Sequence, residues 1–455
     1  MRSYDLSIIG SGPGGYVAGL YASRHRLKVC VIEKDLVGGT CLNRGCIPTK
    51  SLINSASIIS RLKDAQTYGV DIDGYHVNFQ RMMSRKDEVV TRLRTGIETL
   101  FKASKIDLIR QSASLKNHNT ILLSDSEEIE AKYIIIATGS KPAQLAGMAL
   151  SYETGVMSSD EALSMKELPK SIAIVGGGVI GCEFASLFNL LGVKVTIIEF
   201  MDRLIPGQSR EASKKLEVIF KKRGIDISLS SKVEGIAGKD PIKIAISGGK
   251  SIESEKVLIS VGRHAAIEGL GLERAGVKTE KGKIVVDDYL CANSNNIYAI
   301  GDCISGPLLA HKASYDGVLA CDNILGKKIK CDYSNVPSCI WTEPEIASVG
   351  LTEEEARKIY PDIKIAKFPY LASGKAYLKG NIEGYVKLMG DSKGNIAGVE
   401  IMGEGACDLI GEATLARTIG VKIADWAHVV HGHPTISEIF QEAAHIFTGS
   451  PIHGL

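Results

Sequence analysis

Apolar runs of strand length alternate with glycine-rich turns and helical stretches along the chain, and one such unit occurs twice. In the first copy, residues 4–9 (YDLSII) lead into GSGPGG, a helical stretch and a second apolar run that ends at Glu33. In the second copy, residues 171–175 (SIAIV) lead into GGGVIG, a helical stretch and a run that ends at Glu199. Short apolar runs bounded by turns and helices predict the buried strands of a parallel sheet.

The glycines of both turns follow the spacing G-x-G-x-x-G: Gly10, Gly12 and Gly15, and then Gly176, Gly178 and Gly181. The first glycine of such a turn allows the tight bend, the second lets the backbone approach a pyrophosphate, and the third lets the helix pack on the strand. The acid that ends the next strand can accept hydrogen bonds from ribose hydroxyls, and its spacing from the first glycine is equal in both copies. One copy alone would fit an ordinary strand–turn–helix corner equally well. Two copies predict two bound dinucleotides, or one dinucleotide bound twice.

Later strands predict how these units are joined. The runs KYIIIATGS (132–140) and KVLISVGR (256–263) each follow one of the repeated units, and each is an apolar strand that ends in glycine. The strand that ends at Asp302 has no glycine fingerprint, so we expect it to complete the first sheet. The last quarter of the chain shows strands with hairpin signals and then two helices, near residues 411–420 and 435–448. We therefore predict an α/β fold of two Rossmann-like dinucleotide-binding domains, the first interrupted by the second, and a C-terminal α+β domain.

Composition narrows the class of protein. A length of 455 residues suggests about three domains, and a net charge of +2 gives no reason to expect nucleic acid or an anionic membrane as a partner. No apolar run reaches the ~18 residues of a membrane span, because Glu183 interrupts the most apolar stretch. The N-terminal run contains Asp5 and is unlike a signal peptide. The 10 cysteines are scattered, unlike those of a secreted disulfide scaffold, so we expect a cytoplasmic protein.

Cys41 and Cys46 lie in a segment, GGTCLNRGCIPTK, that favours a reactive loop. Their spacing alone is weak support, because scattered cysteines also produce such pairs by chance. The neighbouring glycines allow the loop to fold tightly against a ligand, and Pro48 is suited to the start of a helix. Cys46 would then lie at the helix N-terminus, where the helix dipole favours the thiolate, and Lys50 would face the same way one turn later.

Three kinds of site could use this cysteine pair. A zinc half-site needs two further ligands, and none has matching spacing. A structural disulfide fits poorly with a cytoplasmic chain. A dithiol that exchanges electrons with a bound carrier fits both the loop and the two dinucleotide units. We expect the other eight cysteines to be small buried hydrophobic residues.

The cysteine segment resembles the redox-active disulfide segment of the flavin-dependent pyridine nucleotide–disulfide oxidoreductases. The resemblance covers essentially the whole chain, since GSGPGG, ATGS, GGGVIG, AIGD, LLAHKAS and HGHPTISE also match. It implies an enzyme with FAD and NAD as cofactors. It also implies an FAD-binding domain at residues 1–145, an NAD-binding domain at 146–264, a central segment at 265–332 that completes the FAD domain, and an interface domain at 333–455.

The resemblance also implies which residues hold each cofactor. The residues that match FAD contacts are Gly10, Gly12, Gly15, Glu33, Thr40, Lys50, Thr138, Gly139, Ser140, Asp302, Leu308, Leu309, Ala310 and His311. Those that match the nicotinamide cofactor site are Gly176, Gly178, Gly181, Glu183, Glu199 and Gly262. The carboxylate of Glu199 would repel a 2′-phosphate, which favours NAD over NADP. Arg203 is close enough in the sequence to weaken this argument, and we predict NAD.

The catalytic residues implied by the resemblance are Cys41, Cys46, Lys50, Glu183, His433 and Glu438. Lys50 and Glu183 match the family's ion pair beside the flavin, although many Lys–Glu pairs are only weak surface contacts. The segment HVVHGHPTISE holds three histidines that could also be solvent-facing or core residues, and we predict no metal site there. His433 is held extended before Pro434, and Glu438 is expected in the second turn of the following helix. In the family this pair reaches the disulfide of the opposite subunit, so we expect a homodimer.

The matching segments are most similar to those of family members that oxidise dihydrolipoamide carried by a protein of a multienzyme complex, with reduction of NAD. The expected partner is therefore a lipoyl-bearing protein, because the chain shows no lipoyl domain of its own. One alternative is another disulfide reductase of the family, such as one for glutathione. A second alternative, from a different class, is a structural flavoprotein subunit.

Overall fold

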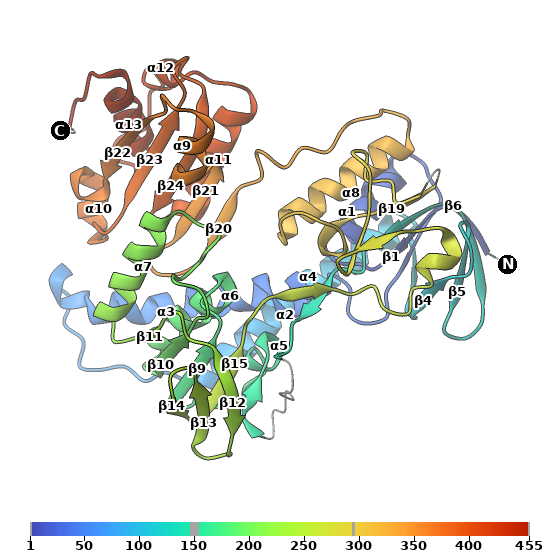
Figure 1. Ribbon diagram of the computed structural model, residues 1–455, viewed down its shortest axis with the longest axis horizontal. Coiled ribbons are helices and arrows are strands. Elements are labelled where there is room, and N and C mark those ends of the chain that lie inside the picture. The colour runs from blue at the N-terminus through green and yellow to red at the C-terminus, as the bar shows by residue number, and fades with distance from the viewer. Residues whose placement is uncertain (1, 146–153, 294–295, 454–455) are drawn as a thin grey trace. The chain divides into compact units, whose positions relative to one another are not determined.

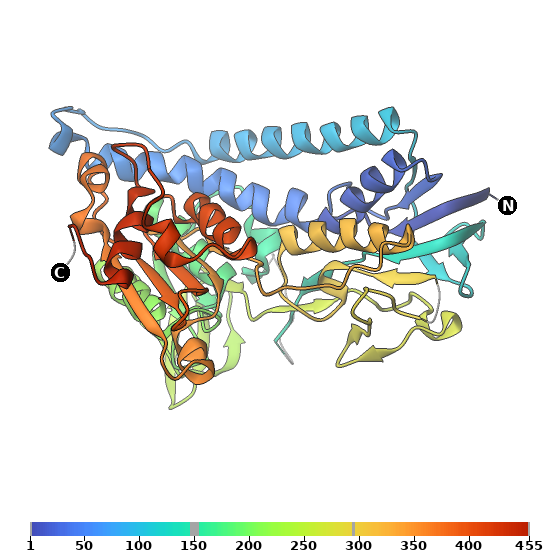
Figure 2. The same cartoon turned by 90° about the horizontal axis from the view of Figure 1, so that it is seen from above.

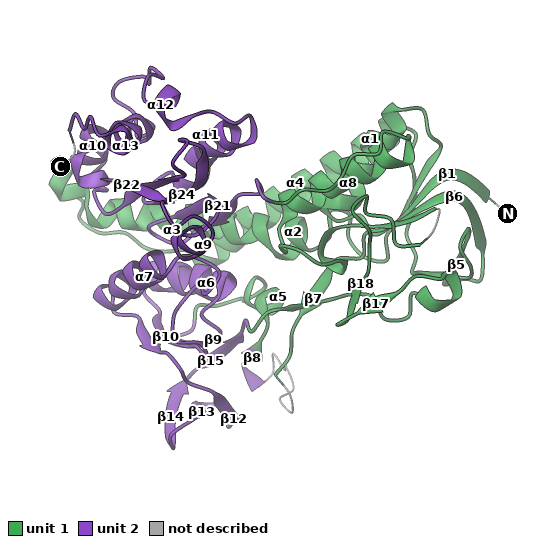
Figure 3. Ribbon diagram, turned by 45° about the horizontal axis from the view of Figure 1, so that its top comes forward, with its two compact units in different colours: residues 1–152, 157–168, 261–333 green, residues 153–156, 169–260, 334–455 purple. Residues whose placement is uncertain are grey.

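The structure is a computed structural model that describes residues 2–145, 154–293 and 296–453. The chain folds into two compact units, each built from segments that are separate in the sequence. Unit 1 contains residues 1–152, 157–168 and 261–333, and unit 2 contains residues 153–156, 169–260 and 334–455 (Figure 3).

Unit 1 is built on a largely parallel sheet. Its strands lie in the order β3-β2-β1-β6-β5-β4, with β19 paired to β6 (Figure 1). The strands are β1 (Arg2–Ile9), β2 (Val29–Ile32), β3 (Asp107–Ile109), β4 (Ala113–Leu115), β5 (Thr120–Leu123), β6 (Glu128–Ile136) and β19 (Ile297–Ala299). Strand β1 runs parallel to β2 and β6, and β19 runs parallel to β6. Leu6, Ile8 and Ile134 are fully buried, as expected for strands that are covered on both faces.

Helix α1 packs on strands β1 and β2 of this sheet, and α4 contacts β3. The α-helices of unit 1 are α1 (Pro13–Arg24), α2 (Gly39–Arg44), α3 (Cys46–Lys63), α4 (Phe79–Ala103), α5 (Ser159–Ala162) and α8 (Ala310–Ile324). Helices α1 and α8 lie side by side, and so do the long helices α3 and α4 (Figure 2). A Cβ atom on Gly317 would lie 2.6 Å from the carbonyl oxygen of Gly14, so α8 can approach α1 only because this position has no side chain. A short pair, β7 (Ser140–Pro142) and β16 (Arg263–Ala265), lies beside the sheet's carboxyl-end loops.

Four strands of unit 2 run parallel to one another in the order β11-β10-β9-β15. These strands are β9 (Ser171–Val175), β10 (Lys194–Ile198), β11 (Asp226–Ser228) and β15 (Lys256–Ile259), and the helices that follow β9 and β10 in the chain are α6 (Val179–Leu190) and α7 (Arg210–Lys222). An antiparallel meander of β12 (Val233–Ala237), β13 (Ile242–Ile246) and β14 (Lys250–Ser254) precedes the last strand.

The C-terminal part of unit 2 is an antiparallel sheet with the order β20-β21-β24-β23-β22. Its elements are β20 (Ser338–Ile340), β21 (Ile346–Gly350), β22 (Lys364–Pro369), β23 (Tyr385–Gly390), β24 (Ile396–Met402), α11 (Ala406–Thr418), α12 (Ile423–Trp426) and α13 (Glu438–Thr448). Trp426 and Phe440 stack at 4.9 Å in the core between the last two helices. The predicted fold class is confirmed: two Rossmann-like sheets, the first completed by a strand from beyond the second, and a C-terminal α+β domain.

Two predicted helix positions need correction. Helix α11 begins at Ala406, before the predicted start near residue 411, and α13 begins at Glu438, after the predicted start near Thr435. The second difference arises because the Glu438 carboxylate accepts a hydrogen bond from the Thr435 amide (2.9 Å), which holds residues 435–437 in a turn. Within the described residues, none of the helices is both long and apolar enough to cross a membrane.

Candidate functional site

The first glycine turn, between β1 and α1, has two crowded positions and one open position. Gly10 has φ +104°, and a Cβ atom there would lie 2.4 Å from the Ala137 carbonyl oxygen. A Cβ atom on Gly15 would lie 1.9 Å from the Gly10 carbonyl oxygen. A Cβ atom on Gly12 would meet nothing within 4 Å. The first and third glycines are therefore required by the fold, and the middle one faces space that a ligand can enter.

The second turn, between β9 and α6, repeats this arrangement in unit 2. Gly176 has φ +109°, and its Cβ atom would lie 2.5 Å from the Ser260 carbonyl oxygen. A Cβ atom on Gly181 would lie 1.9 Å from the Gly176 carbonyl oxygen, whereas one on Gly178 would meet nothing within 4 Å. The two turns thus present the same open backbone at the start of a helix, where amide groups attract phosphates.

The acids that follow each turn are buried and held by the backbone. Glu33 accepts hydrogen bonds from the Ser11 amide (2.8 Å) and the Ser11 hydroxyl (2.7 Å). Glu199 accepts hydrogen bonds from the Gly177 amide and, at 2.6 Å, from the Met201 amide. Both carboxylates are therefore fixed beside their glycine turn, where they could accept hydrogen bonds from the hydroxyls of a ribose.

Arg203, whose positive charge weakens the prediction of NAD over NADP, forms a hydrogen bond within its own loop. Its guanidinium donates a hydrogen bond to the Pro206 carbonyl oxygen at 2.8 Å. This contact uses one of the five N–H donors of the guanidinium.

Ser140, the first residue of β7, forms a polar cluster with Asp302 and Arg263. The Ser140 hydroxyl donates a hydrogen bond to Asp302 (2.6 Å), and Arg263 donates to both the hydroxyl (2.8 Å) and the carbonyl oxygen (2.9 Å) of Ser140. Burial lowers the pKa of Arg263, and the carboxylates of Asp302 and Asp160 oppose that shift. The sequence alone did not identify Arg263 as part of this site, although Arg263 ends the predicted strand KVLISVGR.

The remaining residues predicted to contact FAD also lie in unit 1. The buried hydroxyl of Thr138 lies beside the Cys303 thiol, and its oxygen has no other hydrogen-bond partner among the described residues. Gly139 has φ +69° and open space beside it. Thr40 lies in α2, and residues 308–311 include the first two residues of α8. Gly262, predicted with the NAD residues, belongs to unit 1, whereas the other predicted NAD residues belong to unit 2.

Cys41 and Cys46 lie close together at the junction of two helices. Cys41 is in α2 and Cys46 is the first residue of α3, so Pro48 is the third residue of that helix. A hydrogen bond with the Cys46 thiol, together with burial, raises the pKa of the Cys41 thiol, and the Lys50 ammonium opposes this shift. Both cysteines are half-buried. The two sulfurs are thus in contact at a helix N-terminus, with a cation nearby.

His433 and Glu438 form a second reactive pair, in unit 2. His433 Nδ1 lies 2.8 Å from Glu438 Oε1, and the His433 side chain is 78% exposed. Glu438 is the first residue of α13, which corrects the prediction that it lies in the second turn. Burial acts to raise the pKa of Glu438, but hydrogen bonds from the His433 ring and the Thr435 amide bring it below its ordinary value. The carboxylate thus orients the ring and leaves its other nitrogen outward.

The other residues with a predicted catalytic role are Lys50 and Glu183. Glu183 lies in α6, is buried, and accepts a hydrogen bond from the Trp341 amide at 3.0 Å. Lys50 lies in α3 of unit 1. The two residues belong to different units, and their ion pair stays a prediction. Among the neighbours of His433, His428 contacts the Ala424 carbonyl oxygen (2.8 Å) and His431 contacts Glu412 (2.8 Å).

The expectation that the other eight cysteines are buried holds for four of them. Cys30, Cys182, Cys303 and Cys321 are buried, whereas Cys291, Cys331, Cys339 and Cys407 are half-buried. The prediction is wrong for the second group because their positions, at strand edges, loops and a helix start, are reached by solvent.

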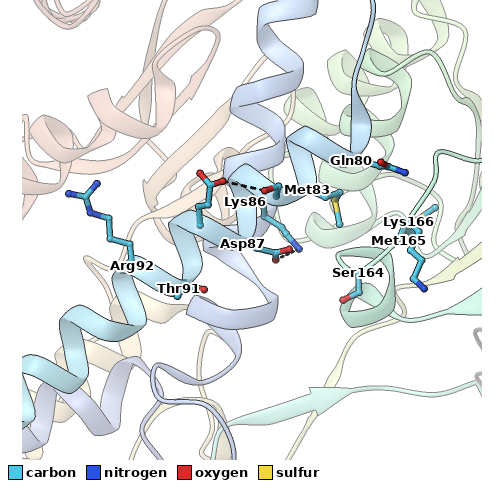
Figure 4. A pocket seen from close by; sticks show the side chains of 11 residues that line it. Gln80, Met83, Lys86, Asp87, Thr91, Arg92, Ser164, Met165 and Lys166 are labelled. Atoms are coloured by element: carbon cyan, nitrogen blue, oxygen red, sulfur yellow. Dashed lines mark hydrogen bonds and ion pairs between the residues drawn. The ribbon is translucent and has the colours of Figure 1, made fainter.

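A pocket of about 940 Å³ lies in unit 1 between α4 and residues 164–166 (Figure 4). Lys86 is buried at this pocket, where it donates a hydrogen bond to the Leu163 carbonyl oxygen (2.7 Å) and pairs with Asp87 (2.7 Å). None of the residues predicted from the sequence lines it.

Comparisons with known proteins cover nearly the whole chain. Residues 4–317 match the family described as pyridine nucleotide-disulphide oxidoreductase, and residues 336–444 match its dimerisation domain. A dihydrolipoyl dehydrogenase of Bacillus subtilis (strain 168) is 41% identical over 99% of this chain and 99% of its own length. A dihydrolipoyl dehydrogenase of Chlamydia pneumoniae is 40% identical over 99% of this chain and 98% of its own length.

Solved structures agree with the fold. The flavoprotein disulfide reductase RclA of Escherichia coli, solved as a Cu(II) complex, is 29% identical with a TM-score of 0.89, over 98% of this chain and 100% of that chain. LpdA of Mycobacterium tuberculosis has a TM-score of 0.92 over 98% of this chain and 99% of that chain, and at 24% identity the likeness concerns the fold.

Proposed function

The chain belongs to the pyridine nucleotide–disulphide oxidoreductase family, and we propose that it oxidises protein-bound dihydrolipoamide to lipoamide while NAD is reduced to NADH. The observation that carries the proposal is the contact between Cys41 and Cys46 at the first turn of α3. Relatives that match this chain over nearly its full length and are named dihydrolipoyl dehydrogenase support the choice of substrate.

The family uses FAD and NAD(H), and residues of unit 1 fit FAD. The open backbone face at Gly12 suits a pyrophosphate, and the fixed carboxylate of Glu33 suits ribose hydroxyls. The buried hydroxyl of Thr138 and the Ser140–Asp302 pair offer further hydrogen bonds. When bound, FAD supplies the two-electron chemistry that joins the cysteine dithiol to the nicotinamide.

Residues of unit 2 fit NAD. The backbone at Gly178 has open space beside it that suits a pyrophosphate. Glu199 is held where its carboxylate would accept hydrogen bonds from ribose hydroxyls and would repel a 2′-phosphate.

Cys41, Cys46 and His433 each have a role in the proposed thiol–disulfide exchange. With Cys41 and Cys46 oxidised, His433 accepts the proton of one substrate thiol, and the resulting thiolate attacks Cys41 Sγ, forms a mixed disulfide and releases Cys46 as a thiolate. The second substrate thiol then attacks the substrate sulfur of the mixed disulfide, and its proton passes to Cys41, which leaves as a thiol. Substrate leaves as a cyclic disulfide, and the two cysteines keep the electron pair.

The residues around these groups suit thiolate chemistry. The N-terminus of α3 favours the thiolate of Cys46, and the ammonium of Lys50 opposes the rise in the pKa of Cys41. Glu438 orients the imidazole of His433 through the contact with Nδ1. In the homodimer that we propose, His433 of one subunit serves the cysteines of the other, and the match to a dimerisation domain supports this assembly.

We also propose a lipoyl-bearing protein of a multienzyme complex as the partner and the cytoplasm as the location. The ten cysteines are scattered along the chain, unlike those of a secreted disulfide scaffold, which supports a reducing compartment. The domain assignment that we propose is FAD-binding for residues 1–145 and 265–332, NAD-binding for 146–264, and interface for 333–455.

Steady-state kinetics of the purified, flavin-loaded protein test the proposal. Dihydrolipoamide with NAD should turn over, whereas glutathione disulfide with NADPH should turn over at least tenfold more slowly. Faster turnover with glutathione disulfide and NADPH would replace the proposal with a glutathione-type reductase. A flavin-loaded dimer without activity on either pair would favour a structural flavoprotein subunit.

A further inference from the structure

Cys339 and Cys407 are far apart in the sequence but adjacent in the C-terminal sheet domain. Cys339 is the middle residue of β20, and Cys407 is the second residue of α11. Cys339 Sγ lies 3.9 Å from the Cys407 carbonyl oxygen, and Cys407 Sγ lies 3.7 Å from the Ile340 carbonyl oxygen. Each sulfur therefore lies against the backbone of the other cysteine's segment.

The two thiols also contact each other. A hydrogen bond with the Cys339 thiol, followed by burial and the Glu345 carboxylate, raises the pKa of the Cys407 thiol well above its ordinary value. Both side chains are half-buried, so a small oxidant can reach them. Neither cysteine has a role in the proposed reaction.

The backbone segments that carry Cys339 and Cys407 are both held by hydrogen bonds to neighbouring residues. Strand β20 pairs with β21, with Cys339 opposite Ala347. Glu345, which directly precedes β21, accepts a hydrogen bond from the Cys407 amide at 3.0 Å. One hairpin thus holds both segments beside each other.

We propose that Cys339 and Cys407 form a second redox-active pair, which a low-molecular-weight disulfide oxidises to an intramolecular disulfide between β20 and α11. The thiolate of one cysteine attacks a sulfur of the small disulfide, forms a mixed disulfide and releases one small thiol. The other cysteine loses its proton to water and attacks the protein sulfur of the mixed disulfide, which releases the second small thiol. The protein loses two electrons and two protons, and the two released thiols carry them. This reaction does not depend on the proposed enzymatic function.

Peptide mass spectrometry of the holoenzyme tests this proposal. The full-length protein is incubated with glutathione disulfide in the absence of NADH and then quenched in acid. Remaining thiols are alkylated in denaturant, and the protein is digested. We expect a peptide pair that joins Cys339 to Cys407, lighter by two hydrogen atoms than the separate peptides and lost after treatment with dithiothreitol.

Two variants sharpen the test. Cys407→Ser should lose the linked peptides and carry a glutathione adduct on Cys339, with flavin content as the check on folding. Cys331→Ser removes a half-buried cysteine of unit 1 and should leave the link unchanged. In the wild-type protein, separate adducts on Cys339 and Cys407 would overturn the proposal. Unmodified thiols at both positions, in a sample where Cys41 and Cys46 are oxidised, would overturn it as well.

Discussion

His433 Nδ1 lies 2.8 Å from Glu438 Oε1, across the turn that leads into α13. The Thr435 amide binds the other oxygen of the same carboxylate at 2.9 Å, so the carboxylate is fixed on both sides. The His433 ring is thereby held with Nδ1 toward Glu438 and its other nitrogen toward solvent, the orientation that a general base requires.

His433→Gln should lower kcat for dihydrolipoamide oxidation by about 10²-fold or more, because general-base catalysis contributes at least that much. Glu438→Gln keeps a hydrogen-bond acceptor but loses the charge, so we expect a smaller loss of about tenfold. Steady-state kinetics of both variants check the order of the two effects. A His433→Gln enzyme that turns over at the wild-type rate would remove this residue from the reaction.

The pH dependence of stability should show the contribution of Glu438. Its pKa is lower in the folded protein than in the unfolded chain, so its ionised form stabilises the fold. This stabilisation is fully present above the ordinary glutamate pKa of about 4.3 and is lost as the pH falls through the lowered folded-state pKa. Urea unfolding at several pH values should show a difference between wild type and Glu438→Gln that disappears in acid. A difference that persists unchanged in acid would contradict this origin.

Cys41→Ser should abolish oxidation of dihydrolipoamide while the protein still binds flavin. Cys41 lies in α2, and serine at this position removes the sulfur that the substrate thiolate would attack. NADH formation measures the activity, and the visible absorbance of the purified protein measures the flavin. Cys331→Ser is the matched control and should retain wild-type turnover. Full activity in Cys41→Ser would show that the reactive disulfide lies elsewhere.

The second glycine turn offers a matched pair of substitutions. Gly181→Ala places a Cβ atom 1.9 Å from a backbone oxygen, so we expect a loss of about 1–3 kcal/mol in the free energy of unfolding. Gly178→Ala meets open space, so stability should be retained while the KM for NAD rises. Thermal unfolding and NAD kinetics separate the two effects. Equal destabilisation by both substitutions would contradict the distinct roles given to these glycines.

A buried ion pair in α8 should be a main determinant of stability in unit 1. Lys312 and Asp316 are fully buried at 2.8 Å, and Asp316 also accepts hydrogen bonds from the Gly301 amide (2.9 Å) and the Tyr333 hydroxyl (2.9 Å). Lys312→Met leaves the carboxylate without its cation and should cost about 3–5 kcal/mol in urea unfolding. Adding Asp316→Asn should recover part of this loss. If the double variant were less stable than Lys312→Met, the charge would not be the cause.

The local features of the site could be predicted from the sequence because each depends on residues close together in the chain. Glycine spacing determines where a strand can turn into a helix, and the acids at the ends of β2 and β10 follow at a spacing set by one helix and one strand. Cys46 lies at the start of a helix that its neighbouring residues determine. Glu438 lies within reach of His433 because the two positions are only five residues apart in the chain.

The contacts between distant segments were decided by the tertiary structure. Arg263 meets Ser140 only because β16 pairs with β7, and Cys339 meets Cys407 only because α11 packs against β20. The start of α13 at Glu438 likewise depends on where the carboxylate finds a donor. Apolar periodicity determines which residues form strands and helices, whereas the side chains that meet across them depend on strand register and helix packing, which no local pattern encodes.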